Sequence, residues 1–417
     1  MNRILLIGNG FDLAHKMRTS YKEFIENYWQ SIIKKIQEKS GQGEFSNQDI
    51  RITEVPNSWE SEYSFQSLVA NLKRNKSKLI FNNKFLEIIT ETAALQNWVD
   101  IENEYYKILK KIIKDSPICP YKDIVKLNND FERIKNNLKD YLVQIEQKFD
   151  REFREPSIKN EIGTKIYSSF KLKDFTEEVF SNVVESEYEK IQTRQKNLFE
   201  GTEHSSLGNN IILDQNSTHP KKDVKKLLFS KNASENFDLT PDQVIFLNFN
   251  YTHTPFLYDD KRKYLNFPHG FSKEVMTEFI NIHGELNNPD NPIIFGFGDE
   301  IDEYYRKIED LNDNKYLHNI KSIRYLDTDN YKRLLRILDD DYFQVFILGH
   351  SCGISDRTLL NTLFEHPNCG SIKTFYYENG ETDNFSDIAR NISRNFNDKS
   401  KMRERVVNKT YCKPLIE

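Results

Sequence analysis

The chain opens with the stretch Arg3-Ile4-Leu5-Leu6-Ile7-Gly8-Asn9-Gly10-Phe11-Asp12-Leu13-Ala14. A buried strand that ends in glycines and turns into a helix is the usual way in which an α/β sheet offers backbone N–H groups to a phosphate. Open parallel sheets bind ligands at the carboxyl ends of their strands. The stretch therefore predicts an α/β fold with a ligand site at this loop. A tight turn without a ligand is the alternative, because Leu13 stands where the dinucleotide fingerprint has its third glycine.

The composition is that of a folded protein. Of 417 residues, 37% are hydrophobic and 13% aromatic, which is ample material for a core. The net charge is −5 with acids and bases interspersed, so a nucleic-acid partner is not expected. No apolar stretch is long enough to span a bilayer. The four cysteines form no C-x-x-C pair, which suits a reducing compartment, and we expect a soluble cytoplasmic protein.

Strand-length apolar runs recur only after about residue 240. They are residues 244–247, 279–282, 292–295, 345–348 and 372–377, and a helical pattern over Thr358–Phe364 follows the fourth. Strand, turn, helix and strand in this order are typical of a parallel sheet. The first strand needs partners, and the good ones lie here. We therefore predict one Rossmann-like domain with a mostly parallel sheet, made of residues 1–20 and 236–417.

Residues 21–235 have a different pattern. Apolar side chains recur at helical spacing over residues 21–36, 98–113 and 131–149, with Lys and Glu between them. Residues 201–225 show no periodicity and many small polar residues, which is typical of a flexible loop. The sequence thus predicts a large, mainly helical insertion after the first strand, with a loop near 201–225.

Polar clusters follow three further strand-like runs. Asn250 lies in Asn248-Phe249-Asn250-Tyr251-Thr252, His283 precedes Gly284, and the last cluster is Gly349-His350-Ser351-Cys352-Gly353-Ile354-Ser355-Asp356. Each has a purely structural interpretation: turn chemistry for the asparagines, a core histidine, and Asp356 as a helix N-cap. Together, at the carboxyl ends of parallel strands, they would converge in one cleft. A histidine placed there is able to take a proton from a hydroxyl.

Two weaker features complete the candidates. Cys352 beside His350 has the composition of a thiol nucleophile, but no third orienting group is evident. Trp98-Val99-Asp100-Ile101-Glu102 places two carboxylates two residues apart on a helix, so that they diverge. We interpret these carboxylates as a solvated face, or as a contact from the insertion to the site.

The order of these motifs resembles that of the AbiH family, bacterial proteins of phage abortive infection. The resemblance rests on residues 8–15, on Thr19-Ser20-Tyr21-Lys22-Glu23-Phe24, and on the motifs around Trp98, Asn250, His283 and Gly349. It covers both ends of the chain and says little about residues 110–235. It implies an anti-phage effector that responds to a phage or host protein.

More remotely, the order is similar to that of the sirtuin-like NAD-binding fold. This likeness implies that Gly8 and Gly10 approach the NAD pyrophosphate and that Gly349 and Ser351 line the adenosine side. Asn250 and His283 would be catalytic, at the nicotinamide ribose and as general base. The other residues that it assigns to cofactor binding are Asn9, Phe11, Asp12, Tyr251, His350 and Asp356. The sequence departs from sirtuins at Asn9 and Thr252, and it lacks their zinc-binding cysteines.

These departures favour NAD degradation over protein deacylation. We therefore expect an NAD+ glycohydrolase that releases nicotinamide and ADP-ribose, with NAD as its substrate and no metal. Two other classes stay open: a non-catalytic nucleotide-binding sensor or interaction protein of phage defence, and a nuclease or other nucleotide hydrolase. The missing cluster of metal-ligating carboxylates counts against the last. Effectors of this kind are often gated by assembly, so a homo-oligomer is also open, but the sequence identifies no interface.

Overall fold

A computed structural model describes residues 1–38, 44–53, 79–96, 100–200, 213, 217–230, 232–265 and 273–417. The chain divides into two compact units. The first unit consists of Met1–His15, Arg154–Glu285 and Thr328–Glu417, and the second of Lys16–Phe153 and Leu286–Asp327.

The first unit is built on a six-stranded sheet in the order β6-β5-β1-β7-β8-β9, and all neighbouring strands are parallel. This confirms the predicted α/β class and parallel sheet. The N-terminal strand is central: Leu5 lies opposite Phe246 on one side and Phe346 on the other. The strands are β1 (Asn2–Ile7), β5 (Gln243–Asn248), β6 (Met276–Asn281), β7 (Phe343–Leu348), β8 (Cys369–Tyr376) and β9 (Lys413–Pro414).

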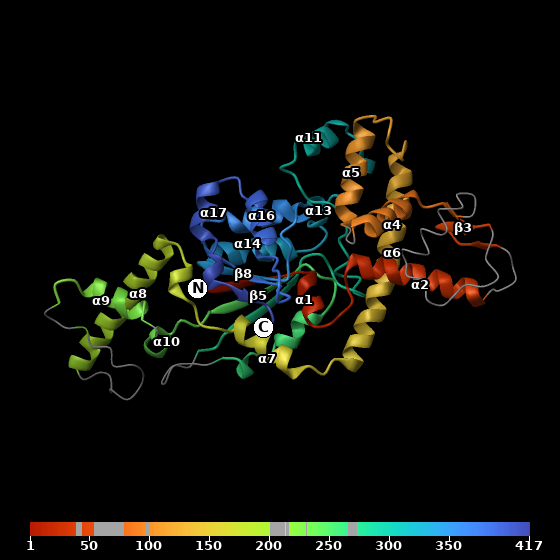
Figure 1. Ribbon diagram of the computed structural model, residues 1–417. Helices are drawn as coiled ribbons and strands as arrows, with labels where there is room; N and C mark the ends of the chain where they lie inside the picture. Colours follow the sequence, from red (N-terminus) through yellow and green to blue (C-terminus); the bar gives the residue numbers. More distant parts are fainter. Residues whose placement is uncertain are drawn as a thin grey trace. The chain divides into compact units, whose positions relative to one another are not determined.

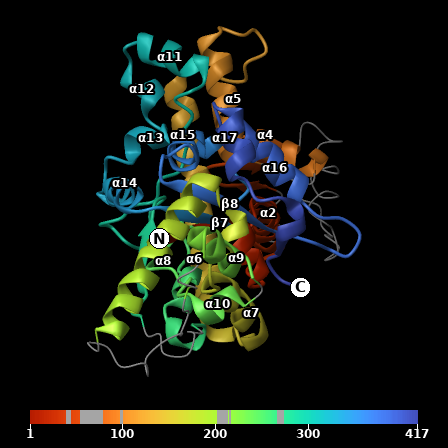
Figure 2. The same ribbon diagram turned by 90° about the vertical axis from the view of Figure 1, so that its left-hand side faces the viewer.

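Helices cover both faces of this sheet (Figures 1 and 2). On one face, Leu5 and Ile7 pack in a hydrophobic cluster with three isoleucines of α7. On the other, α14 contacts β6, and α15, α16 and α17 contact β8. The helices of this unit are α1 (Asn9–Ala14), α7 (Pro156–Ile166), α8 (Glu177–Phe199), α9 (Pro220–Leu228), α10 (Ala233–Asn236), α14 (Asn330–Asp340), α15 (Arg357–Phe364), α16 (Phe385–Asn395) and α17 (Lys399–Arg405).

Short 3-10 helices connect several of these elements. They are η1 (Leu172–Asp174), η2 (Thr254–Tyr258), η3 (Lys261–Lys263), η4 (Ile354–Asp356) and η5 (Lys409–Tyr411). The tight turn η4 leads directly into α15, so it determines how the residues after β7 enter that helix.

The loop predicted over residues 201–225 is wrong at its end, because residues 220–225 belong to helix α9. Pro220 is at the start of this helix, where its missing N–H costs nothing. Val224 and Leu228, four residues apart, are buried in a cluster with side chains of α8. Residues 201–212 and 214–216 lie outside the described part of the chain.

The boundaries of the two units differ from the domain boundaries predicted at residues 20 and 235. Helices α7 to α10 belong to the unit with the parallel sheet. Residues 286–327, predicted as part of the α/β domain, belong to the helical unit. Hydrophobic periodicity identifies a helix but not the core against which it packs, and this explains the difference.

The second unit is mainly helical. Its helices are α2 (Tyr21–Glu38), α4 (Lys84–Gln96), α5 (Ile101–Ile113), α6 (Ile124–Glu152), α11 (Glu303–Asp310), α12 (Asn314–Leu317) and α13 (Lys321–Arg324). A small antiparallel sheet consists of β2 (Phe45–Ser46), β3 (Ile50–Ile52) and β4 (Leu79–Phe81). Helix α2 begins with a capping box, in which Ser20 and Glu23 each accept a hydrogen bond from the other's backbone N–H.

The apolar run at residues 292–295 is not a strand, contrary to prediction. Ile294 and Phe295 are buried without sheet pairing. The Phe295 ring stacks on Phe131 of α6, with ring centroids 4.8 Å apart. This short apolar run therefore packs against helices. The length of such a run does not distinguish this role from that of a buried strand.

Glu102 is also not on a solvated face. It is buried, and its carboxylate lies 3.0 Å from the equally buried Lys321 ammonium and accepts a hydrogen bond from the Gly296 backbone N–H at 3.1 Å. Asp100 instead caps α5 by accepting from the backbone N–H of Asn103. Trp98 and Val99 lie outside the described residues. Glu102 thus joins α5 to the segment that contains α13 within the second unit.

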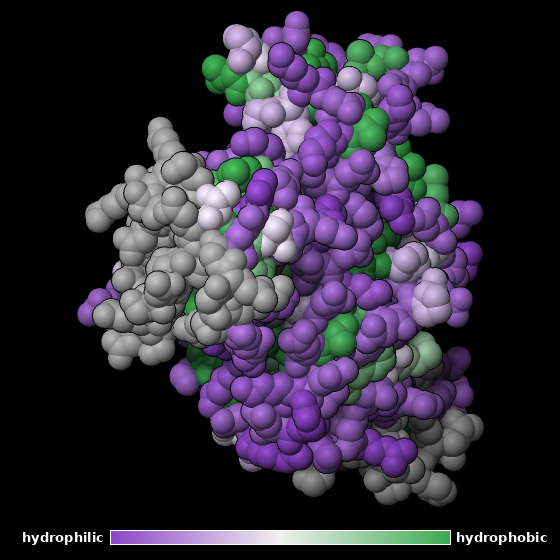
Figure 3. Space-filling view, turned by 90° about the vertical axis from the view of Figure 1, so that its right-hand side faces the viewer, coloured by the Kyte–Doolittle hydropathy of each residue, from purple (hydrophilic) through white to green (hydrophobic). Residues whose placement is uncertain are grey.

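Most of the surface in Figure 3 is hydrophilic, and hydrophobic side chains occur there in small separate groups. Scattered apolar side chains of this kind are normal on a protein surface. Among the residues with described positions, no helix has the length and apolar character needed to cross a membrane.

Replacing Glu102 tests the buried ion pair. Glu102→Ala leaves the Lys321 ammonium buried without this carboxylate, and we expect it to lower the free energy of unfolding by about 3–5 kcal/mol. Glu104→Ala, on the same helix, removes only a surface pair with Lys107 and should cost no more than about 1 kcal/mol. Urea denaturation followed by circular dichroism measures both. Equal effects of the two substitutions would contradict the structural role of Glu102.

Candidate functional site

The four polar clusters follow four adjacent strands, β6, β5, β1 and β7. Because these strands are parallel, their carboxyl ends share one edge of the sheet, and the clusters lie on that edge. The clusters therefore lie on one edge of the sheet in the first unit, and the cleft predicted between them stays a prediction. Their detailed roles depend on the contacts described next.

The glycine loop after β1 packs directly on the loop after β7. The Gly10 N–H donates to the Gly349 carbonyl at 2.9 Å, and the Gly8 N–H donates to the Leu348 carbonyl at 3.3 Å. A Cβ on Gly8 would lie 2.5 Å from Cα of His350. Gly349 has φ +74°, and a Cβ there would lie 2.1 Å from the Phe11 nitrogen. Close backbone approach therefore explains Gly8, Gly10 and Gly349.

Three backbone N–H groups of the glycine loop are used inside the protein, since that of Phe11 donates to the Gly8 carbonyl at 2.8 Å. The Phe11 side chain is fully buried, with its ring against those of His15 and Tyr258. Asp12 is buried and accepts a hydrogen bond from the Thr252 hydroxyl at 2.7 Å. Asn9 is exposed. Of the residues in this loop, Asn9 is thus the one whose side chain faces solvent most openly.

The centre of the site is a carboxylate between two imidazoles. Nε2 of His283 lies 3.2 Å from one oxygen of Asp356, and Nε2 of His350 lies 3.7 Å from the other. Nδ1 of His350 accepts a hydrogen bond from the Cys352 backbone N–H at 3.0 Å, so the proton of a neutral His350 is on Nε2, facing Asp356. All three side chains are buried. This arrangement brings together residues that are far apart in the sequence.

Asp356 occupies the N-cap position of α15, as predicted, but its side chain makes no capping hydrogen bond. The carboxylate points to the two histidines instead. The interpretation as a simple helix cap is therefore incomplete. Its position at a helix N-terminus still favours the ionised carboxylate, because the helix dipole is positive there.

Asn250 is held by its amide nitrogen. Nδ2 of Asn250 donates to the Gly8 carbonyl at 3.0 Å, which ties the loop after β5 to the loop after β1. Its backbone N–H donates to the side-chain oxygen of Asn248 at 3.1 Å. The amide oxygen of Asn250 is a hydrogen-bond acceptor, as in any asparagine.

Two residues that the sequence analysis did not single out organise the site. The ring of Phe249 contacts both imidazoles, with centroids 5.0 Å from His283 and 4.3 Å from His350. The side chain of Asn248 donates to the Thr252 carbonyl and to Asn281 Oδ1 at the end of β6. In the sequence, the only feature that could have identified Phe249 and Asn248 is their position at a strand end beside Asn250. Tyr251 is buried, and Ser351 is exposed, at the edge of this group.

Cys352 is not activated as a nucleophile. Its thiol is fully buried, and burial, reinforced by the negative charge of Asp356, raises the pKa of this thiol far above its usual range. The thiolate is the nucleophilic form, so a buried thiol of this kind is inert. Among the described residues, no group of three His, Cys, Asp or Glu side chains is arranged to hold a metal ion.

A model of the family described as Bacteriophage abortive infection AbiH matches residues 4–378. The chain belongs to this family. Membership confirms the resemblance predicted from the motifs and indicates a function in phage abortive infection. No curated protein and no solved structure matches the chain.

Replacing Gly349 tests the contact between the two loops of this AbiH family member. In Gly349→Ala, the added Cβ is strained by the left-handed backbone conformation and clashes with the backbone of Phe11. Gly380 also has a positive φ, +87°, but nothing lies within 4 Å of an added Cβ. We expect Gly349→Ala to cost about 1–3 kcal/mol more stability than Gly380→Ala in thermal or urea denaturation. Equal costs would show that the loops yield without penalty.

His15 gives the AbiH protein a pH-dependent term in its stability. Burial lowers the pKa of His15 to about 4, and its ring nitrogens contact the Phe11 carbonyl and the Tyr258 hydroxyl. The unfolded chain binds this proton near pH 6.5, so stability falls as the pH is lowered from about 6.5 to about 4, by about 3 kcal/mol. Urea denaturation of wild type and His15→Gln across this range measures it. An unchanged pH slope in the variant would contradict the assignment.

Proposed function

We propose that this AbiH protein hydrolyses NAD+ to nicotinamide and ADP-ribose. The observation that carries the proposal is the buried group of His283, Asp356 and His350 at the carboxyl edge of the parallel sheet, with Asn250 on the adjacent loop. This edge is where open parallel sheets bind nucleotides. The order of motifs along the chain, which resembles that of sirtuin-like NAD-binding proteins, adds to this support.

The reaction breaks the bond between C1′ of the ribose and the nicotinamide nitrogen. The electron pair of this bond goes to the ring nitrogen, so nicotinamide leaves as a neutral base and positive charge develops on the ribose. A water oxygen then bonds to C1′, and the water loses one proton. An enzyme site has to hold the water, take this proton and stabilise the charge.

The residues present suit these tasks. His283 takes the proton, and the adjacent Asp356 carboxylate stabilises the imidazolium that forms, as a carboxylate does beside a catalytic histidine. The amide oxygen of Asn250 accepts a hydrogen bond from the water and orients it. Phe249 packs against both imidazoles and keeps bulk water from them. In this proposal Gly8 and Gly10 allow close packing of the loops, and Asn9 reaches the ligand.

A non-catalytic nucleotide sensor is the second candidate. The burial of His283 and Asp356 favours it, because a buried side chain is less accessible to a reacting substrate. In such a sensor the nucleotide stays bound and unchanged. Chemical identification of any nucleotide that co-purifies with the protein separates the two candidates, since tight retention without turnover belongs to the sensor.

The test is NAD+ loss and nicotinamide release by the purified protein, with and without lysate of phage-infected cells. General-base catalysis and its positioning contribute about 10²–10⁴-fold, so His283→Ala, Asn250→Ala and Asp356→Asn should each lower turnover at least 100-fold. Thermal denaturation of each variant verifies that it is folded.

The matched control is His366→Ala. His366 lies 3.3 Å from the carboxylate of Asp339, so it is also a histidine beside an aspartate, but away from this edge of the sheet. We expect this variant to keep wild-type turnover. Wild-type activity in His283→Ala, or no NAD+ loss under any condition, would overturn the hydrolase and favour the sensor.

A further inference from the structure

A cavity of the first unit lies on the α7 face of the sheet. Its volume is 690 Å³, within the range of small-molecule pockets. The floor is formed by β7 and β8, including Phe346 and Phe375, which belong to the same hydrophobic cluster as α7. The walls are α7, the segment 168–174 and the chain's last residues. None of its lining residues belongs to the group around His283 and Asp356.

The lining of this cavity carries an excess of positive charge. Its five lysines are accompanied by three carboxylate side chains. Each carboxylate already holds one lysine, in the pairs Lys165–Glu161, Lys373–Asp174 and Lys413–Glu417. Two lysines remain, Lys171 and Lys173. Within the described part of the chain, neither has a carboxylate at ion-pair distance.

The surroundings hold these two ammonium groups at the cavity. Lys173 Nζ lies 3.9 Å from the centre of the Tyr411 ring, on the cavity wall. Burial lowers the pKa of Lys171, and the charges of Lys373, Lys173 and Lys413 lower it further, against the opposing charge of Asp174. Nearby cations that lower this pKa also attract an anion, because both effects come from the same positive potential.

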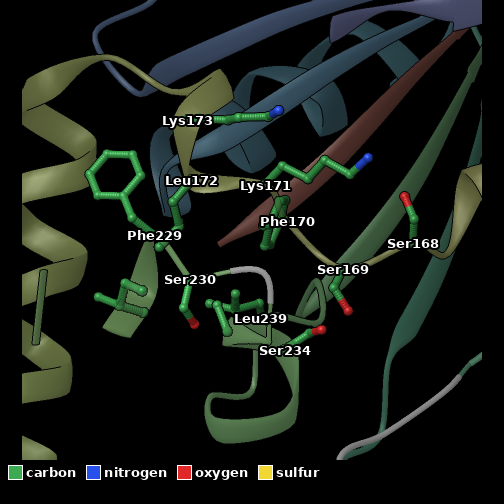
Figure 4. Close-up of a pocket in the computed structure, with 12 residues that line it drawn as sticks. Ser168, Ser169, Phe170, Lys171, Leu172, Lys173, Phe229, Ser230, Ser234 and Leu239 are labelled. Atoms are coloured by element: carbon green, nitrogen blue, oxygen red, sulfur yellow. The ribbon is translucent and has the colours of Figure 1, made fainter. Parts of the chain in front are cut away.

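Ser168, Ser169, Lys171 and Lys173 also line a neighbouring cavity of 540 Å³ (Figure 4). In Figure 4, the ammonium groups of Lys171 and Lys173 extend to the same side, away from the hydroxyls of Ser230 and Ser234. Ser168 and Ser169 line both cavities, and the Ser168 hydroxyl donates a hydrogen bond to the Lys165 carbonyl at 2.9 Å. A bound phosphate would thus meet two cations from one short stretch of chain.

We propose that this cavity binds a small organic molecule through a phosphate monoester, which Lys171 and Lys173 hold. A phosphate monoester carries about two negative charges at neutral pH, which matches the two lysines without carboxylate partners. The volume is far larger than a free phosphate needs, and the aromatic side chains at the floor and wall suit an organic moiety. This site is separate from the proposed NAD+ site and does not depend on it.

Isothermal titration calorimetry of the full protein with AMP, adenosine and inorganic phosphate, at constant ionic strength, tests the proposal. We expect saturable binding of AMP, weaker binding of phosphate and no binding of adenosine. Lys171→Ala/Lys173→Ala should weaken AMP binding at least tenfold. Because both side chains are exposed, this variant is expected to fold normally.

The control is Lys196→Ala/Lys226→Ala, which changes the net charge equally and removes two exposed lysines from outside the cavity. It should bind AMP as wild type does. Binding of AMP that is equal in wild type and in Lys171→Ala/Lys173→Ala would place the ligand elsewhere, for example at the edge near His283, and would overturn the proposal. Failure of both AMP and phosphate to bind would also overturn it. Neither outcome bears on NAD+ hydrolysis, which is measured separately.

Discussion

The backbone contact between the loops after β1 and β7 is the constraint on which the candidate site depends. It requires that Gly8, Gly10 and Gly349 have no Cβ, since each would collide with the opposite loop. The contact places His350 against the glycine loop, and the hydrogen bond from Asn250 to Gly8 adds the loop after β5. The first two strand ends are thereby held together by main-chain atoms, and the third is attached through the short Asn250 side chain.

The position of Asp356 follows from this arrangement. A carboxylate is costly to bury unless charged or hydrogen-bonding groups surround it. Here two imidazoles and the N-terminus of α15 supply that environment, and Phe249 closes it from the side of β5. A side chain that only capped α15 would bond to nearby backbone N–H groups and would not face the two histidines. The Asp356 carboxylate faces the histidines instead, which supports the proposed catalytic role of this group.

The first unit also contains a buried cation, Arg3. Arg3 of β1 is fully buried, and burial lowers its pKa to about 9. It donates to the carbonyls of Ile166 and Ser168, and its guanidinium lies 4.8 Å from the centre of the Phe170 ring. Arg3 thus anchors the end of α7 and the following segment to the central strand. The same segment continues to Lys171 and Lys173, so this anchor also positions the wall of the lysine-lined cavity.

Local pattern determined much of this protein. The strands at residues 3–7, 244–247 and 345–348, most of the helices, and the polar clusters after the strands could all be predicted, because side-chain periodicity and turn residues act over a few neighbours. The order of motifs also identified the family. Other features were decided only by the tertiary structure. They are the central position of β1 in the sheet and the packing of α7 against that sheet. They also include the burial of Glu102 beside Lys321 and the orientation of the Asp356 carboxylate toward His283. These depend on partners distant in the sequence, and the free energy of burying a charge or an apolar run is set by those partners rather than by local spacing.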